Sequence, residues 1–318
     1  MKPTSTKLKS PAGKKSNTDS SARRKIVTSS NTFPVVAIGA SAGGLEAVTQ
    51  LLQNLPADTG MGFIYVQHLS PDHKSILTAL LTKATLMKVQ EVKNRMRIEP
   101  NNLYVIPPDK AMTVEDGHIK LTPRRKERAI NLPIDTFFCS LAENHKAGAI
   151  GIILSGSAHD GTLGMKAIKH EGGLTFAQDD SAKFNSMPKS AIAEGVVDFI
   201  LSPKEIALEL ARLSKHPFVK NKGIKKNQED LIDNNDPDLK IILNLLHRTT
   251  RVDFSVYKMN TVKRRIIRRM LLYKIQTLRE YATMLSEKSA EIDLLYQDLL
   301  INVTSFFRDS DAHRYLKT

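Results

Sequence analysis

The chain has 318 residues, of which 41% are hydrophobic and 25% charged, a composition typical of a globular protein with about two domains. No apolar run approaches the roughly 18 residues of a membrane helix, and residues 1–10 lack the apolar stretch of a signal peptide. The single cysteine, Cys139, excludes an intramolecular disulfide and a cysteine-based zinc cluster. We therefore expect a soluble cytoplasmic protein.

The net charge of +14 is concentrated at the two ends of the chain. Residues 1–33 carry eight Lys or Arg against one Asp, and residues 239–318 carry fifteen Lys or Arg against eight acidic residues. Residues 34–238 carry twenty-four of each sign and are neutral. A basic protein often binds nucleic acid, but this distribution weakens that interpretation for the largest part of the chain.

Taken in chain order, the pattern begins with a disordered basic tail at residues 1–33, rich in Ser, Thr and Lys. Short apolar runs then predict buried strands at 34–38, 63–66, 103–106, 149–154, 174–177 and 196–201. Helical spacing predicts helices at 43–55, 75–83, 134–145, 163–171 and 203–213, and Asp116-Gly117 predicts a hairpin. Strands that alternate with helices indicate an α/β domain with a mainly parallel sheet at residues 34–215.

A second, helical part follows the α/β domain. Residues 216–238 are polar and charged and are expected to form a linker. Residues 239–300 contain almost no Gly or Pro and predict a small all-α domain.

The sequence GASAGG at 39–44 connects the first predicted strand to the first predicted helix. Such a tight turn presents the hydroxyl of Ser41 at the carboxyl edge of the sheet, above backbone N–H groups that can stabilise an oxyanion. The pattern also fits the GxSxG turn of serine hydrolases. The alternatives are a glycine-rich anion-binding turn and a plain connection between strand and helix.

Two further polar residues follow predicted strands and complete a candidate catalytic set. His68 comes directly after the strand at 63–66 and can serve as the base that a serine nucleophile needs. Asp160 lies after the strand at 149–154 and can orient the imidazole, although an N-cap is its simpler interpretation. The order Ser, His, Asp differs from that of α/β-hydrolases.

Five motifs stand out in residues 34–214: IGASAGGLEAV at 38–48, QHLSPDHKS at 67–75, LYVIPPD at 103–109, LSGSAHDG at 154–161 and FAQDDSAKFNSMPKSAI at 176–192. Together they give this region a specific resemblance to the catalytic domain of the chemotaxis receptor methylesterases, the CheB family. The resemblance implies a doubly wound sheet flanked by helices. It also implies hydrolysis of glutamyl methyl esters, and deamidation of glutamines, on chemotaxis receptors, without a metal or other cofactor.

The resemblance also implies a role for each candidate residue. Ser41 matches the nucleophile, His68 the base and Asp160 its orienting partner. The backbone around Ala42 and Ser157 matches the oxyanion region. The expected partners are the cytoplasmic signalling helices of methyl-accepting receptors, with no nucleic acid and no insertion into the membrane.

The C-terminal part resembles a second family. LLINVTSFFRD at 299–309 is similar to the start of the catalytic region of the receptor methyltransferases, the CheR family, and residues 239–300 resemble its N-terminal helical domain. Residues 301–318 would then begin a truncated methyltransferase domain, from which we expect no methyl transfer. In a full-length enzyme, the resemblance implies that Asn302, Thr304 and Arg308 help to form the S-adenosylmethionine site.

The helix expected at 261–275 is strongly basic. Spacing of i, i+4 places its arginines on one face; they are Arg264, Arg265, Arg268 and Arg269. The resemblance implies that this face docks onto acidic receptor helices. A solvated basic face is the alternative.

Two other functions use the same features. A non-enzymatic DNA-binding regulator or signalling scaffold could use the basic helix and tail, but residues 253–260 lack the glycine-containing turn of a helix-turn-helix. A nucleotide-binding module could use the glycine turn, but the chain has no GxGxxG or Walker A sequence.

Overall fold

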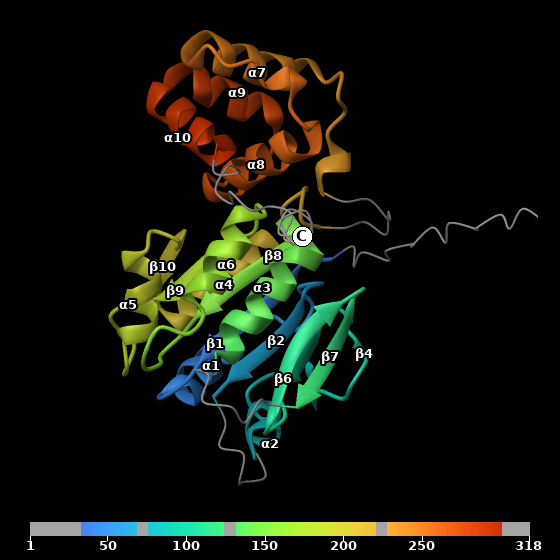
Figure 1. Cartoon of the computed structure of the whole chain (residues 1–318), viewed down its shortest axis with the longest axis vertical. Helices are drawn as coiled ribbons and strands as arrows, with labels where there is room; N and C mark the ends of the chain where they lie inside the picture. Colours follow the sequence, from blue (N-terminus) through green and yellow to red (C-terminus); the bar gives the residue numbers. More distant parts are fainter. Residues whose placement is uncertain (1–32, 69–75, 124–131, 221–227, 301–318) are drawn as a thin grey trace, which may run out of the picture.

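The computed structural model describes residues 33–68, 76–123, 132–220 and 228–300. It contains an α/β domain and a helical domain, which lies against one end of the α/β domain (Figure 1). The tail expected at 1–33, apart from Phe33, and the region 301–318 lie outside the described residues. No helix in the described ranges is long and apolar enough to cross a membrane.

A seven-stranded, wholly parallel sheet forms the centre of the α/β domain, in the order β10-β9-β8-β1-β2-β5-β3. The strands are β1 (Val35–Ala40), β2 (Gly62–Gln67), β3 (Lys88–Glu91), β5 (Asn102–Val105), β8 (Ala149–Ile153), β9 (Leu174–Gln178) and β10 (Phe199–Leu201). The strand order reverses around β1, which lies between β2 and β8. Such a reversal opens a crevice at the carboxyl edge of a parallel sheet, where α/β proteins bind their ligands.

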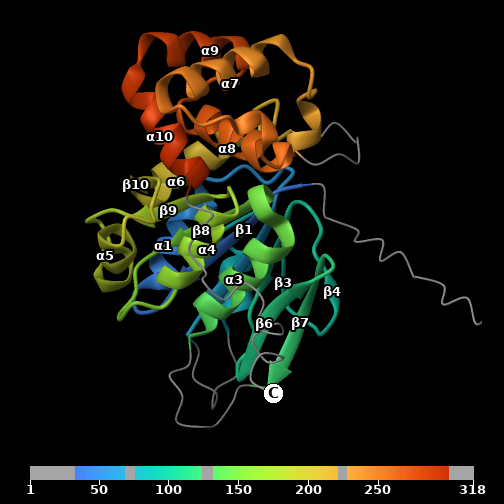
Figure 2. The same cartoon turned by 45° about the horizontal axis from the view of Figure 1, so that its top comes forward.

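Helices cover both faces of this sheet, as a doubly wound fold requires (Figure 2). They are α1 (Gly44–Gln53), α2 (Leu77–Thr82), α3 (Pro133–His145), α4 (Thr162–His170), α5 (Ser186–Ala193) and α6 (Pro203–Leu213). Because successive strand residues point to opposite faces, Val36 and Ile38 pack into the core of α1 and α6. Val35 and Ala37 pack into the core of α3 and α4. The predicted fold class is confirmed.

A small antiparallel sheet flanks α3 and has the order β4-β7-β6. It consists of β4 (Met96–Arg97), β6 (Lys110–Glu115) and β7 (His118–Pro123). Asp116 and Gly117 connect β6 to β7 with φ angles of 48° and 73°, which are typical of a tight hairpin turn. The predicted hairpin is confirmed, whereas the short strands β3 and β4 and helix α5 were not predicted.

The helical domain contains four α-helices among the described residues: α7 (Pro237–Thr250), α8 (Met259–Leu272), α9 (Leu278–Glu287) and α10 (Ser289–Leu300). Short 3₁₀ turns η2 (Gln228–Leu231) and η3 (Phe254–Val256) accompany these helices, and a further 3₁₀ turn, η1 (Lys146–Gly148), lies between α3 and β8 in the α/β domain. The linker expected at 216–238 is partly folded, because Ile232 is buried and its carbonyl accepts a hydrogen bond from Lys263 Nζ at 2.6 Å. Helix α7 begins within that expected linker, at Pro237.

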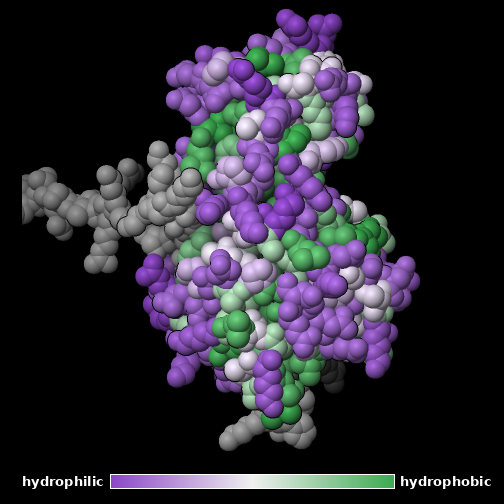
Figure 3. Space-filling view, turned by 180° about the vertical axis from the view of Figure 1, so that it is seen from behind, coloured by the Kyte–Doolittle hydropathy of each residue, from purple (hydrophilic) through white to green (hydrophobic). Residues whose placement is uncertain are grey.

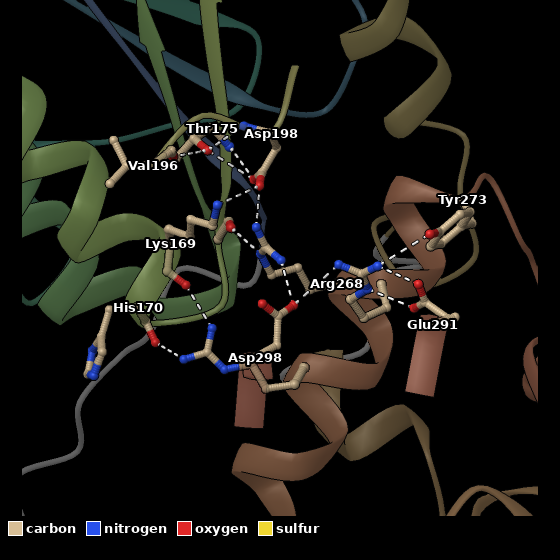
Figure 4. Close-up of polar contacts among 12 residues, drawn as sticks. Lys169, His170, Thr175, Val196, Asp198, Arg268, Tyr273, Glu291 and Asp298 are labelled. Atoms are coloured by element: carbon tan, nitrogen blue, oxygen red, sulfur yellow. Dashed lines mark hydrogen bonds and ion pairs between the residues drawn. The ribbon is translucent and has the colours of Figure 1, made fainter. Parts of the chain in front are cut away.

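The four arginines of α8 do not form an exposed docking face. Arg264, Arg265 and Arg268 contact the α/β domain at the domain junction, and Arg269 is buried within the helical domain. Arg265 donates to the last carbonyls of α4, those of Lys169 and His170. Figure 4 shows these two residues near Arg268 and its acidic partners. Arg268 is 1% exposed and donates to the Gly173 carbonyl at 3.1 Å.

Carboxylates from both domains compensate these buried guanidiniums. Arg268 pairs with Asp198 of the α/β domain and with Asp298 of α10. Arg269 donates to Glu291 of α10 at 2.8 Å.

Because these arginines are buried, the prediction that they form a receptor-docking face is wrong. Arg264, the remaining member, has a side chain that is only 11% exposed. The partners of Arg268 in the α/β domain, Gly173 and Asp198, immediately precede β9 and β10 and so lie at the amino edge of the sheet. A substrate is expected at the opposite, carboxyl edge. The physical reason for the burial of the arginines is that each guanidinium finds carbonyls or carboxylates of the fold, which compensate its removal from water.

We expect Arg268→Ala to lower the free energy of unfolding by about 3–5 kcal/mol, because Asp198 and Asp298 would stay buried with only their more distant cationic partners, Lys169 at 3.6 Å and Arg269 at 3.8 Å. The measurement is urea denaturation of the whole chain. Lys288→Ala, at an exposed position of the same domain, is the control and should change the value by less than about 0.5 kcal/mol. Equal losses in the two variants would contradict a compensated buried charge.

Candidate active site

Ser41 lies in the turn between β1 and α1, at the carboxyl edge of the central strand. Its N–H donates to the Ser155 carbonyl at 3.0 Å, and its carbonyl accepts from Gly44 N–H at 2.9 Å. Gly43 has a left-handed φ of 71°, and a Cβ there would lie 2.7 Å from Ser155 Oγ. Glycine is therefore required at this position both for the backbone conformation and for space.

The three residues predicted to act together lie in one hydrogen-bonded chain. Ser41 Oγ lies 3.4 Å from His68 Nδ1, and His68 Nε2 lies 2.7 Å from Asp160 Oδ2. His68 follows β2 and Asp160 follows β8, the two neighbours of β1. The parallel sheet thus brings together residues 92 positions apart.

Asp160 is 1% exposed and is held by the N-terminus of α3. Its two carboxylate oxygens accept hydrogen bonds from the N–H groups of Ile134 and Asp135, at 3.0 and 2.9 Å. These two N–H groups at a helix N-terminus give both oxygens of the buried carboxylate a hydrogen-bond donor. Asp160 is therefore more than the N-cap that the simpler interpretation suggested.

The imidazole of His68 takes a defined orientation between its partners. An ionised Asp160 only accepts hydrogen bonds, so Nε2 of the neutral ring carries the proton and donates. The lone pair of Nδ1 then faces the serine hydroxyl and can accept its proton. This tautomer is the one that a base for Ser41 requires.

The two predicted oxyanion positions lie on loops that meet at Ser41. Within the described residues, the N–H groups of Ala42 and Ser157 donate no hydrogen bond to the protein. A Cβ built on Gly156 would lie 3.1 Å from the Ser41 Cβ, so the loop that carries Ser157 passes directly beside the serine. Two N–H groups without a protein partner, on loops that pass beside the serine, fit the needs of a tetrahedral oxyanion.

Comparison with known proteins agrees with this geometry. Residues 36–210, more than half of the chain, match the family model described as CheB methylesterase. The chain belongs to the CheB methylesterase family. Residues 237–300 match the model of the CheR methyltransferase all-alpha domain, whose all-helical nature the structure reproduces in α7 to α10.

Individual relatives and a solved structure support the same assignment. The crystal structure of the Thermotoga maritima CheB methylesterase catalytic domain matches with a TM-score of 0.53 and 28% identity, over 57% of this chain and all of that one. A Carboxydothermus hydrogenoformans protein named protein-glutamate methylesterase/protein-glutamine glutaminase 1 is 32% identical over 59% of this chain and 57% of its own length.

Another relative matches over a longer part of this chain. It is a Rhodobacter capsulatus protein of 104.1 kDa, described as uncharacterized, and it is 34% identical over an alignment of 255 residues. The match covers 74% of this chain but only 27% of that relative.

Several residues of the CheB site escaped the sequence analysis. The Ser155 hydroxyl donates to the Ala42 carbonyl at 2.8 Å and accepts from Phe184 N–H at 3.0 Å, and so ties three loops together. Gln178, the last residue of β9, accepts from Ser155 N–H at 2.9 Å. Both residues lie inside the quoted motifs, but nothing in their spacing separates them from their neighbours.

Asp135 is a second carboxyl beside Asp160 that the sequence did not reveal. Its Oδ1 accepts from Gly164 N–H in the first turn of α4 at 2.8 Å. Burial raises the pKa of the Asp135 carboxyl, the hydrogen bond from Gly164 opposes this effect, and the negative charge of Asp160 adds to it. Asp135 thereby links α3 to the turn that positions Asp160. The remaining predicted site residues, Asn302, Thr304 and Arg308, lie outside the described residues.

We expect Gly43→Ala to destabilise the protein more than Gly60→Ala, which is a matched control. Both glycines have φ angles above 70°, but a Cβ at Gly60 meets no atom within 4 Å. Each variant carries the left-handed penalty of about 1–2 kcal/mol. Gly43→Ala also overpacks the Ser155 hydroxyl and should lose about 1–3 kcal/mol more. Urea denaturation measures the free energy of unfolding of both variants. Equal losses would show that the turn accommodates a Cβ at residue 43 without a packing penalty.

Proposed function

We propose that the chain is a protein-glutamate methylesterase that hydrolyses glutamyl methyl esters on methyl-accepting chemotaxis receptors, and that it deamidates receptor glutamines by the same route. One observation carries this proposal: the relay from Ser41 through His68 to Asp160, at the carboxyl edge of a CheB-family sheet. The names of relatives, which combine methylesterase and glutaminase, support the substrate class.

The mechanism begins with acyl transfer to the serine. Ser41 Oγ forms a bond to the ester carbonyl carbon while His68 Nδ1 takes its proton. Asp160 stabilises the resulting imidazolium through Nε2–H. The N–H groups of Ala42 and Ser157 accommodate the tetrahedral oxyanion.

The intermediate then collapses and the acyl-enzyme is hydrolysed. The bond to the methoxy oxygen breaks, and His68 returns the proton so that methanol leaves. Water attacks the acyl-serine with His68 again as the base, and glutamate is released. A glutamine substrate follows the same steps and releases ammonia. The residues of the chain supply every group in these steps, so the proposal includes no metal and no cofactor.

The two alternative functions have less support than the esterase. DNA binding relied partly on the arginines of α8, which are buried, and partly on the basic tail, which lies outside the described residues. Nucleotide binding relied on the glycine turn, which here carries the serine of the relay. The carboxyl edge, away from the helical domain, is where we propose that a receptor helix docks.

We expect Ser41→Ala and His68→Ala each to reduce turnover by at least about 1,000-fold, and the double variant to be little worse, because nucleophile and base act as a unit. The measurement is methanol release from a methylated receptor fragment.

Ser214→Ala, at the end of α6, is the matched control and should keep full activity. Losses that multiply in the double variant would contradict a shared mechanism. Full activity of Ser41→Ala would overturn the proposed function.

A further inference from the structure

A cavity of about 500 Å³ lies at the junction of the two domains, remote from the serine site. The α/β domain contributes Lys146, His170 and Glu171, next to the C-terminal end of α4. The helical domain contributes Lys258, Arg264 and Arg265, among others. Seen from behind, the molecule has two lobes and a waist where hydrophilic residues are prominent (Figure 3). Cavities of this volume hold small organic ligands.

Positive charge dominates the walls of this cavity. Lys146, Lys258, Arg264 and Arg265 face a single lining carboxylate, Glu171. The close approach of His170, whose Nδ1 lies 3.7 Å from Glu171 Oε1, and the charges of Lys146 and Arg264 lower the pKa of Glu171 to about 2, against the opposing effect of burial. Arg264 Nε also lies 3.8 Å from Glu229 Oε1, so two carboxylates offset the four lining cations and a surplus of positive charge remains.

The two arginines have unused binding capacity. Arg265 is 2% exposed, yet its partners among the described residues are backbone carbonyls, and no carboxylate there pairs with it. Burial, together with Arg268 and Arg264, lowers the pKa of Arg265 to about 10. Nη1 of Arg264 is buried and has no hydrogen-bond partner in the described ranges, with Glu171 Oε2 3.7 Å away. A buried guanidinium without a full set of partners favours binding of an anion.

Apart from Thr261, the rest of the wall is apolar or aromatic. Val262 and Leu299 are buried, and Leu300 and Tyr257 are 38% and 47% exposed. A ligand that fills the cavity therefore meets an aromatic ring and aliphatic side chains as well as cations. A phosphate monoester, with a charge of about −1.5 to −2, matches the surplus of cations better than one carboxylate does.

We propose that this interdomain cavity binds a phosphorylated small molecule, with the phosphate between Lys146, Lys258 and Arg264 and the organic part against Tyr257 and Leu300. The ligand contacts both domains at once, so its binding stabilises their docked arrangement by mass action. This proposal is independent of the esterase activity, because the cavity lies at the amino edge of the sheet.

Calorimetric titration of the whole chain with guanosine 5′-monophosphate tests the site. We expect binding tighter than about 1 mM that weakens as salt is added, and no binding of guanosine, which lacks the charge. Inorganic phosphate should compete with the nucleotide but bind more weakly. Absence of nucleotide binding, or equal binding of guanosine, would overturn the proposal.

Charge reversal at the two exposed cations locates the site without disturbing the buried arginines. Lys146→Glu and Lys258→Glu, one in each domain, should each weaken nucleotide binding about tenfold or more. Lys288→Glu makes the same charge change on an exposed part of the helical domain outside the cavity, and should leave the affinity within about twofold. Equal affinities in all three variants would place the nucleotide elsewhere and refute the assignment. All three should keep esterase activity, so the result does not depend on the proposed function.

Discussion

The direction of the parallel sheet is the constraint on which the rest of this molecule depends. Because all seven strands run the same way, every loop that follows a strand lies at one edge and every loop that precedes a strand lies at the other. Ser41, His68 and Asp160 follow β1, β2 and β8 and meet at the carboxyl edge. Gly173 and Asp198 precede β9 and β10 and receive the helical domain at the amino edge. The serine site and the domain junction therefore lie at opposite edges of the same sheet.

The domain junction shows how a strongly charged helix can become part of an interior. A buried guanidinium is costly unless carboxylates or carbonyls replace its water. For Arg268, these partners come from three places in the chain: Gly173, Asp198 and Asp298. Arg269 draws on Glu291 in the same way, and Tyr281 donates its hydroxyl to that carboxylate at 2.9 Å. The compensation is therefore a property of the assembled fold and not of α8.

The sequence predicted the elements and the triad well because both depend on local patterns. Apolar runs and the residues that bound them predict strand β1 and helix α6. They also predict that three polar residues follow strands, namely Ser41, His68 and Asp160. The fate of the arginines could not be predicted from helical spacing, because Arg268 on a polar face looks the same whether water or Asp198 faces it. Ser155 and Gln178 were missed for a related reason, since their roles lie in contacts between loops distant in the chain.

The apolar core beneath α1 and α6 continues into the helical domain. Leu213 and Val219 belong to the same buried cluster as Leu239, Ile266 and the other inner residues of the four-helix part. Arg212 and His216 reinforce this seam with hydrogen bonds to the carbonyls of Leu271 and Ile275, at 3.0 and 2.8 Å. If the chain were cut between the two domains, each fragment would expose an apolar surface that promotes self-association. The core of the α/β domain therefore extends beyond its family match, which ends at residue 210.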